Sequence, residues 1–110
     1  MKLVYLTLLF DIYGELLTVK QQDFFEDYYH DNLSLREIAD KYNISHQGVR
    51  DNLKRTESIL TSYEEKLGIL EKEKALTGEL KNVISLLDTI EIEEKDREMI
   101  KNKIISLIDE

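Results

Sequence analysis

The stretch that decides the fold is residues 33–60, which read LSLREIADKYNISHQGVRDNLKRTESIL. Ser34 and Glu37 have the spacing of a capping box, in which each side chain bonds the backbone amide of the other at the start of a helix. Asn43 tolerates the left-handed conformation that ends a helix, and Ser45 can cap a second helix. The stretch therefore predicts a helix-turn-helix over residues 34–56.

The apolar residues of both predicted helices repeat at the spacing of one helical face. The predicted shared core consists of Leu35, Ile38, Ala39, Tyr42, Ile44, Val49, Leu53 and Thr56. Ala39 is small enough to let the helices cross closely, and Ile44 can fill the corner between them. Two short amphipathic helices with a tight turn also occur in proteins that bind no nucleic acid, so this pattern alone leaves the function open.

The second helix carries the candidate binding residues. In a helix-turn-helix that reads DNA, this helix enters the major groove with its N-terminal residues at the base edges. The outward residues here are His46, Gln47, Arg50, Lys54 and Arg55. We expect Arg50 and Lys54 to contact phosphates, and Gln47 to contact a base, because glutamine can pair with adenine.

The net charge opposes that function. It is −8, and it is spread evenly, because residues 1–67 carry 8 basic and 12 acidic groups and residues 68–110 carry 7 and 11. Such a field repels the phosphate backbone unless a local patch overcomes it. Residues 45–55 form such a patch, because they contain three basic residues and one acidic residue, Asp51. We therefore expect binding that is weak, sensitive to salt, or dependent on a dimer.

The composition limits the other possible functions. A chain of 110 residues fits one domain with one modest core, and no proline interrupts its helices. The chain has no cysteine, and His30 and His46 are too few and too badly spaced for a structural zinc site. It also lacks a glycine-rich phosphate loop and a catalytic triad. We expect no metal, no cofactor and no enzymatic activity.

The N-terminal apolar run is easily mistaken for a targeting segment. Leu3–Phe10 is eight residues long, and charged Asp11 and Glu15 follow it without a cleavage pattern. It is also much shorter than the roughly 20 residues that span a bilayer. We therefore expect a cytoplasmic protein that keeps its N-terminus and does not insert into a membrane.

Helical patterns cover the rest of the chain, and they predict an all-α fold in one domain, residues 1–110. A helix over 2–17 is apolar on every side, which places it centrally or at a subunit interface. A second helix, over 18–30, begins with a capping box of Thr18 and Gln21, and its aromatic face is assigned to the core.

The helix-turn-helix is followed by a long helical continuation. The second helix of the helix-turn-helix carries residues at the spacing of a coiled-coil seam. They are Val49, Leu53, Thr56, Leu60, Tyr63 and Leu67. This helix either breaks near Gly68 or continues through it toward Ala75. An exposed bend is expected over 70–74, within a helical C-terminal extension, 70–110, that breaks near Asp88 and ends in a helix over 93–108.

These apolar surfaces predict a homodimer. A monomer of this length has limited interior in which to bury helix 2–17, the seam and the apolar stripes of the tail. Closed dimers are the commonest soluble assembly, and a dimer would double a small set of phosphate contacts. The competing arrangement is a monomer in which the tail covers helix 2–17.

Several motifs resemble the YlxM-like family of small bacterial proteins. They are LFDIYGELLT at 9–18, the aromatic pairs at 24–25 and 28–29, LSLREIA at 33–39 and DNLKRTE at 51–57. The helix-turn-helix is also similar to the promoter-reading region-four domain of bacterial sigma factors, a winged-helix-like arrangement without the wing. The resemblance implies an all-helical bacterial protein of the cytoplasm. It further implies a role in the signal recognition particle pathway, because members are encoded beside the particle's protein subunit.

Two functions remain open on the sequence. The chain is either a DNA- or RNA-binding regulator or a protein-interaction module that binds components of the signal recognition particle without reading DNA. The fold does not decide between them.

Overall fold

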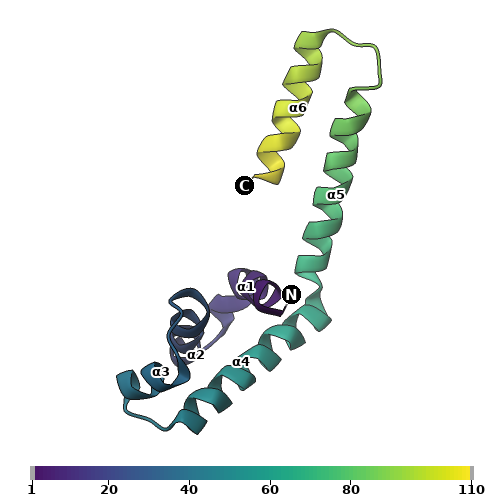
Figure 1. Ribbon diagram of the computed structural model, residues 1–110. Helices are drawn as coiled ribbons and strands as arrows, with labels where there is room; N and C mark the ends of the chain where they lie inside the picture. Colours follow the sequence, from purple (N-terminus) through teal and green to yellow (C-terminus); the bar gives the residue numbers. More distant parts are fainter. Residues whose placement is uncertain (1, 110) are drawn as a thin grey trace. The chain divides into compact units, whose positions relative to one another are not determined.

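The computed structural model describes residues 2–109, which form helices and no β-strand. The α-helices are α1 (Lys2–Tyr13), α2 (Val19–Phe25), α3 (Leu35–Tyr42), α4 (His46–Leu67), α5 (Ile69–Leu87) and α6 (Glu94–Ile108) (Figure 1). A 3₁₀ turn, η1 (Gly14–Leu16), follows α1, and a π-helical turn, η2 (Glu26–His30), extends α2. The predicted all-α class is confirmed.

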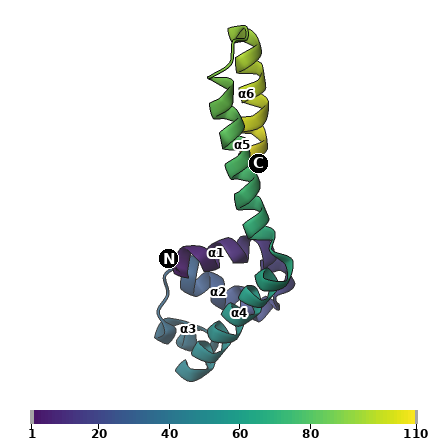
Figure 2. The same ribbon diagram turned by 90° about the vertical axis from the view of Figure 1, so that its right-hand side faces the viewer.

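The chain divides into two compact units, one that ends at Leu70 and one that begins at Glu71. In the first unit, α1, α2 and α3 all pack against α4 (Figures 1 and 2). One buried cluster consists of Leu6, Leu9, Tyr13, Leu17, Phe25, Leu60 and Leu70. The other consists of Phe24, Ile38, Ala39, Val49 and Leu53 and matches the predicted core of the helix-turn-helix.

The predicted coiled-coil seam is occupied by the chain's own core. Val49, Leu53, Thr56 and Leu60 are all buried, because α1, α2 and α3 cover that side of α4. Helix α1 is likewise central to the unit, since its own Leu6, Leu9 and Tyr13 are buried in the core. The seam is therefore not a free surface for a second helix.

Two helix ends differ from the predicted ones. The first α-helix stops at Tyr13 instead of residue 17, and the Leu17 amide donates to the Gly14 carbonyl at 3.1 Å. Gly14 is buried under Phe10, where a Cβ would lie 3.2 Å from the ring. The predicted Thr18 capping box is confirmed, but the helix that it starts changes to a π-helical turn at Glu26.

The predicted bend over 70–74 is wrong, since these residues are helical; of the two predicted ends of the preceding helix, the structure has the break at Gly68. Gly68 adopts a left-handed conformation, with φ of 62°, and α5 starts at the next residue. The Ile69 amide donates to the Tyr13 hydroxyl at 3.3 Å, and the Leu70 amide donates to Glu64 Oε1 at 3.0 Å. The first turn of α5 is therefore capped by Tyr13, which is distant in the sequence, and by Glu64 near the end of α4.

The second unit is a helical hairpin in which α5 and α6 lie side by side and antiparallel (Figures 1 and 2). Arg97 holds the connection between them, because its Nε donates to the Leu87 carbonyl at 3.0 Å and its Nη2 to the Ile90 carbonyl at 2.8 Å. The predicted break after Leu87 and the predicted last helix are confirmed. That both units behave as one domain stays a prediction.

Candidate nucleic-acid interface

Local hydrogen bonds fix the corner between α3 and α4. The Glu37 amide donates to Ser34 Oγ and the Ser34 amide to Glu37 Oε1, both at 3.0 Å, which completes the predicted capping box. The hydrogen bond from the Ser34 amide to the carboxylate lowers the pKa of Glu37. Asn43 ends α3 in the left-handed conformation, with φ of 55°, and Ser45 Oγ accepts from the Gly48 amide at 3.0 Å. The start of α4 is therefore held in one position.

Gly48 is explained by this cap. A Cβ at Gly48 would lie 3.2 Å from Ser45 Oγ, the atom that caps the helix, and 3.8 Å from Ile44 Cδ1. A side chain there would crowd the capping hydroxyl and the corner residue together. Nothing in the sequence pattern points to this contact.

Asp27 braces α3 from the neighbouring turn η2. Its carboxylate is buried, accepts from Lys41 Nζ at 3.0 and 3.2 Å, and accepts from the Tyr42 hydroxyl at 2.8 Å. The hydrogen bond to Asp27 raises the pKa of Lys41. A buried carboxylate is stable in a protein only when it is paired in this way. The brace holds the helix that supports α4.

The predicted binding residues all lie on solvent-facing surfaces of α4. His46, Gln47, Arg50, Lys54 and Arg55 are exposed. Among the described residues, Arg50, Lys54 and Arg55 form no ion pair. Gln47 Nε2 donates to Asp51 Oδ1 at 2.8 Å, which leaves its carbonyl oxygen and one N–H free for a base edge.

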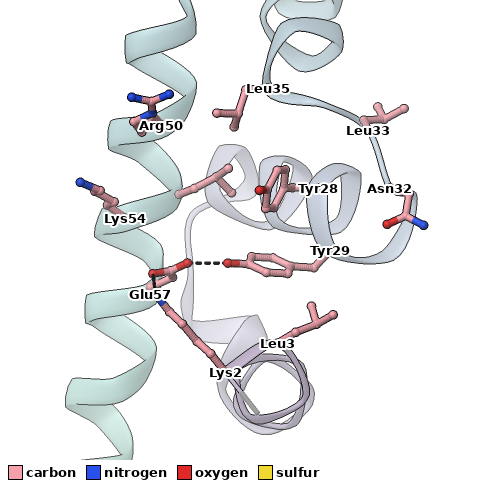
Figure 3. Close-up of a pocket in the computed structure, with 11 residues that line it drawn as sticks. Lys2, Leu3, Tyr28, Tyr29, Asn32, Leu33, Leu35, Arg50, Lys54 and Glu57 are labelled. Carbon is pink, nitrogen blue, oxygen red and sulfur yellow. Dashed lines mark hydrogen bonds and ion pairs between the residues drawn. The ribbon is translucent and has the colours of Figure 1, made fainter.

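The structure divides these residues between two sides of α4. Arg50 and Lys54 line a groove of about 720 Å³ (Figure 3). Arg55 lines a smaller hollow of about 390 Å³, opposite Thr18 and Lys20 at the start of α2. The groove and the hollow use different residues, so they can be tested separately.

Two cations that the sequence analysis missed lie beside these surfaces. Lys2 from α1 shares the groove with Lys54, and Lys20 from α2 shares the hollow with Arg55. Both are far from α4 in the sequence, so no local pattern could have assigned them. Lys20 adds positive charge to a patch that the sequence limits to residues 45–55, whereas the charge of Lys2 is balanced by Glu57, with which it pairs at 3.3 Å.

Two features are absent from residues 2–109. No group of three or more His, Asp or Glu side chains there is arranged to hold a metal ion. In the same range, no helix is long and apolar enough to cross a membrane.

Comparison with known proteins identifies relatives over most of the chain. A family model described as "Putative helix-turn-helix protein, YlxM / p13 like" matches residues 1–105. A UPF0122 protein of Desulforamulus reducens is 49% identical over 98 residues, 89% of this chain and 84% of the relative. A UPF0122 protein of Listeria welshimeri is 44% identical over 101 residues, 88% of this chain and 92% of the relative. One from Shouchella clausii is 48% identical over 86 residues, which cover 76% and 79% of the two chains.

Proposed function

This chain belongs to the YlxM / p13-like family of helix-turn-helix proteins, and from that premise we propose that it is a regulatory protein that binds duplex DNA through α4. One observation carries the proposal. Arg50, Lys54 and Arg55 are exposed and form no ion pair among the described residues, on a helix whose start is fixed by caps. Because the family's relatives are bacterial, we place this activity in a bacterial cytoplasm.

Each outward residue has a proposed role. Arg50, Lys54 and Arg55 contact phosphates, and Gln47, oriented by Asp51, contacts a base. His46 is the first residue of α4 and lies beside Gln47 at the end that enters the groove. Three phosphate contacts give a slope of about −2.7, for each bound chain, of the logarithm of affinity against that of salt concentration.

We propose further that the DNA-binding form is a homodimer. A net charge of −8 works against a single set of three phosphate contacts, and a dimer doubles that set. The hairpin of α5 and α6 supports this proposal, because it keeps large apolar side chains exposed. These are Leu76, Val83, Leu86, Ile90, Met99, Ile100, Ile105 and Leu107.

The test is a titration of the full chain against labelled duplex DNA at about 50 mM and about 200 mM salt. Arg50→Glu is expected to lower the affinity at least about tenfold, since it replaces a phosphate contact with a repulsion. The matched control is Lys95→Glu on α6, because both variants change the net charge from −8 to −10 by turning one +1 group into −1. Equal affinity of the two variants would overturn the proposal.

A second candidate function is a protein-interaction module for the signal recognition particle. Two observations favour it: the net charge of −8, and the acidic Asp51 on the outward face of α4. The same titration therefore includes the RNA and the protein subunit of the particle as separate ligands. Binding to the protein subunit without binding to duplex DNA would replace the first proposal with this one.

A further inference from the structure

The groove beside α4 combines an apolar floor with a positively charged wall. Leucines from three helices and from the segment before α3 contribute the floor, together with the rings of η2. The floor is lined by Leu3, Leu33, Leu35, Leu53, Tyr28 and Tyr29. Arg50 and Lys54 form the wall on α4, with Lys2 at one end (Figure 3).

The one acidic side chain in the lining, Glu57, is already engaged. Its carboxylate accepts a hydrogen bond from the Tyr29 hydroxyl and pairs with Lys2 Nζ at 3.3 Å (Figure 3). Arg50 and Lys54 have no such partner among the described residues. The charge that the groove presents to a ligand is therefore positive.

We propose that this groove binds an acidic amphipathic helix of a protein partner. The leucine floor takes the apolar face of that helix, and Arg50 and Lys54 pair with its carboxylates. Four leucines do not suit a nucleic-acid backbone, which needs donors and cations along its length. The residues that the structure describes also offer no β-strand edge for an extended peptide, so a helix in a groove is the fitting mode.

Arg50 and Lys54 belong to both this groove and the proposed DNA contact. An acidic helix seated on them would block the phosphate contacts, so the partner and duplex DNA would compete for α4. This part of the inference rests on the proposed function. The groove itself does not, because its floor lies outside the DNA contact.

The probe is the labelled synthetic peptide EAELEELLEALEEA, whose leucines fall on one helical face. One control peptide has the same residues in an order that spreads the leucines around the helix, and another has lysine in place of every glutamate. The full chain is expected to bind the first peptide at least about tenfold more tightly than either control. Equal affinity for the three peptides would overturn the proposal.

Two matched pairs of variants locate the peptide. Leu3 and Val4 are neighbours on α1, 49% and 53% exposed, but only Leu3 lines the groove. Leu3→Glu is expected to weaken peptide binding about tenfold, and Val4→Glu to leave it within about twofold. Arg50→Ala is likewise expected to weaken it more than Arg55→Ala, because Arg55 lines the hollow on the other side. Equal losses within either pair would contradict the assignment.

Duplex DNA and a single-stranded RNA, titrated with the same variants, separate this proposal from the DNA-binding one. If Leu3→Glu weakens peptide binding and leaves DNA binding unchanged, the result supports the groove as a separate site. Absent DNA binding with intact peptide binding would refute only the DNA proposal. RNA binding that needs Leu3, without peptide binding, would show that nucleic acid occupies the groove and would overturn the inference.

Discussion

Three tyrosine side chains act as neutral hydrogen-bond donors to carboxylates. Tyr13 donates to Glu64 at 2.7 Å, Tyr29 to Glu57 and Tyr42 to Asp27 at 2.8 Å. Burial raises the pKa of all three above the ordinary value of 10.0, and the hydrogen bond to the carboxylate raises it further. Each tyrosine therefore stabilises the fold only while it stays protonated.

The first prediction is a loss of stability at high pH. The folded state holds these protons more tightly than the unfolded chain, so their stabilisation is complete below pH 10.0 and falls as the pH rises further. Lys41, whose pKa is also raised, acts in the same direction above its ordinary 10.5. Urea denaturation at about pH 8 and about pH 11 is expected to show this decrease.

The matched variants for this test are Tyr29→Phe and Tyr42→Phe. Each removes one raised pKa, so each should make the free energy of unfolding less dependent on alkaline pH than in the wild type. Unchanged stability between the two pH values, in the wild type, would contradict the assigned hydrogen bonds.

Some helix ends can be predicted from the local sequence, and others cannot. Ser34 and Ser45 accept from amides three residues away, and Asn43 ends α3 through its own left-handed conformation, so the local sequence is enough to predict the corner. The start of α5 could not be predicted in that way. Its first amides bond to Tyr13 and Glu64, and Tyr13 lies 56 residues from Ile69.

The same limit applies to the candidate site. The outward positions of Arg50, Lys54 and Arg55 follow from the helical period of α4, and they were predicted. The nearby positions of Lys2 and Lys20 depend on how α1 and α2 pack, which no local pattern contains. The helical period also predicts the apolar seam on α4. It does not determine whether the seam is covered by this chain or by a second one.

The second prediction concerns Asn43 in the turn of the helix-turn-helix. Its φ of 55° costs other side chains about 1–2 kcal/mol, because their Cβ approaches the following carbonyl oxygen. Asn43→Ala is expected to lower the free energy of unfolding by about that amount, measured by urea denaturation. Asn43→Gly is the control, since glycine adopts this conformation without the penalty. If the two variants were equally stable, the left-handed turn would be wrong.

Across the whole molecule, the two units differ in how much of their apolar surface is buried. The first unit has two buried clusters. In the second, Leu87 is the single buried apolar residue in the described part, and Leu86 and Leu107 are each 61% exposed. A two-helix hairpin can bury only one face of each helix, so such surface normally marks an interface.

The third prediction is a dimer that depends on this hairpin. Light scattering during size exclusion is expected to give twice the 13.0 kDa mass of the chain. The double variant Leu86→Lys, Leu107→Lys should return it to a monomer, because the added charges would be buried in the interface. Val19→Lys is the control, since Val19 is 71% exposed on α2. Leu9 is buried in the core, so a charge there would unfold the chain instead of separating subunits.

A mass of one chain for the wild type at micromolar concentration would end the dimer proposal. It would favour a monomer in which the apolar surface of the hairpin is covered by another part of the same chain. A dimer that survives the double variant would place the interface elsewhere.

The proposed function depends most on contact between α4 and DNA. Backbone amide chemical shifts of the full chain, followed by NMR during a titration with duplex DNA at low salt, test this directly. The largest shifts are expected over residues 45–55, where the exposed cations and Gln47 lie, with small shifts over 94–108. DNA binding that leaves residues 45–55 unchanged and shifts another part of the chain would contradict it.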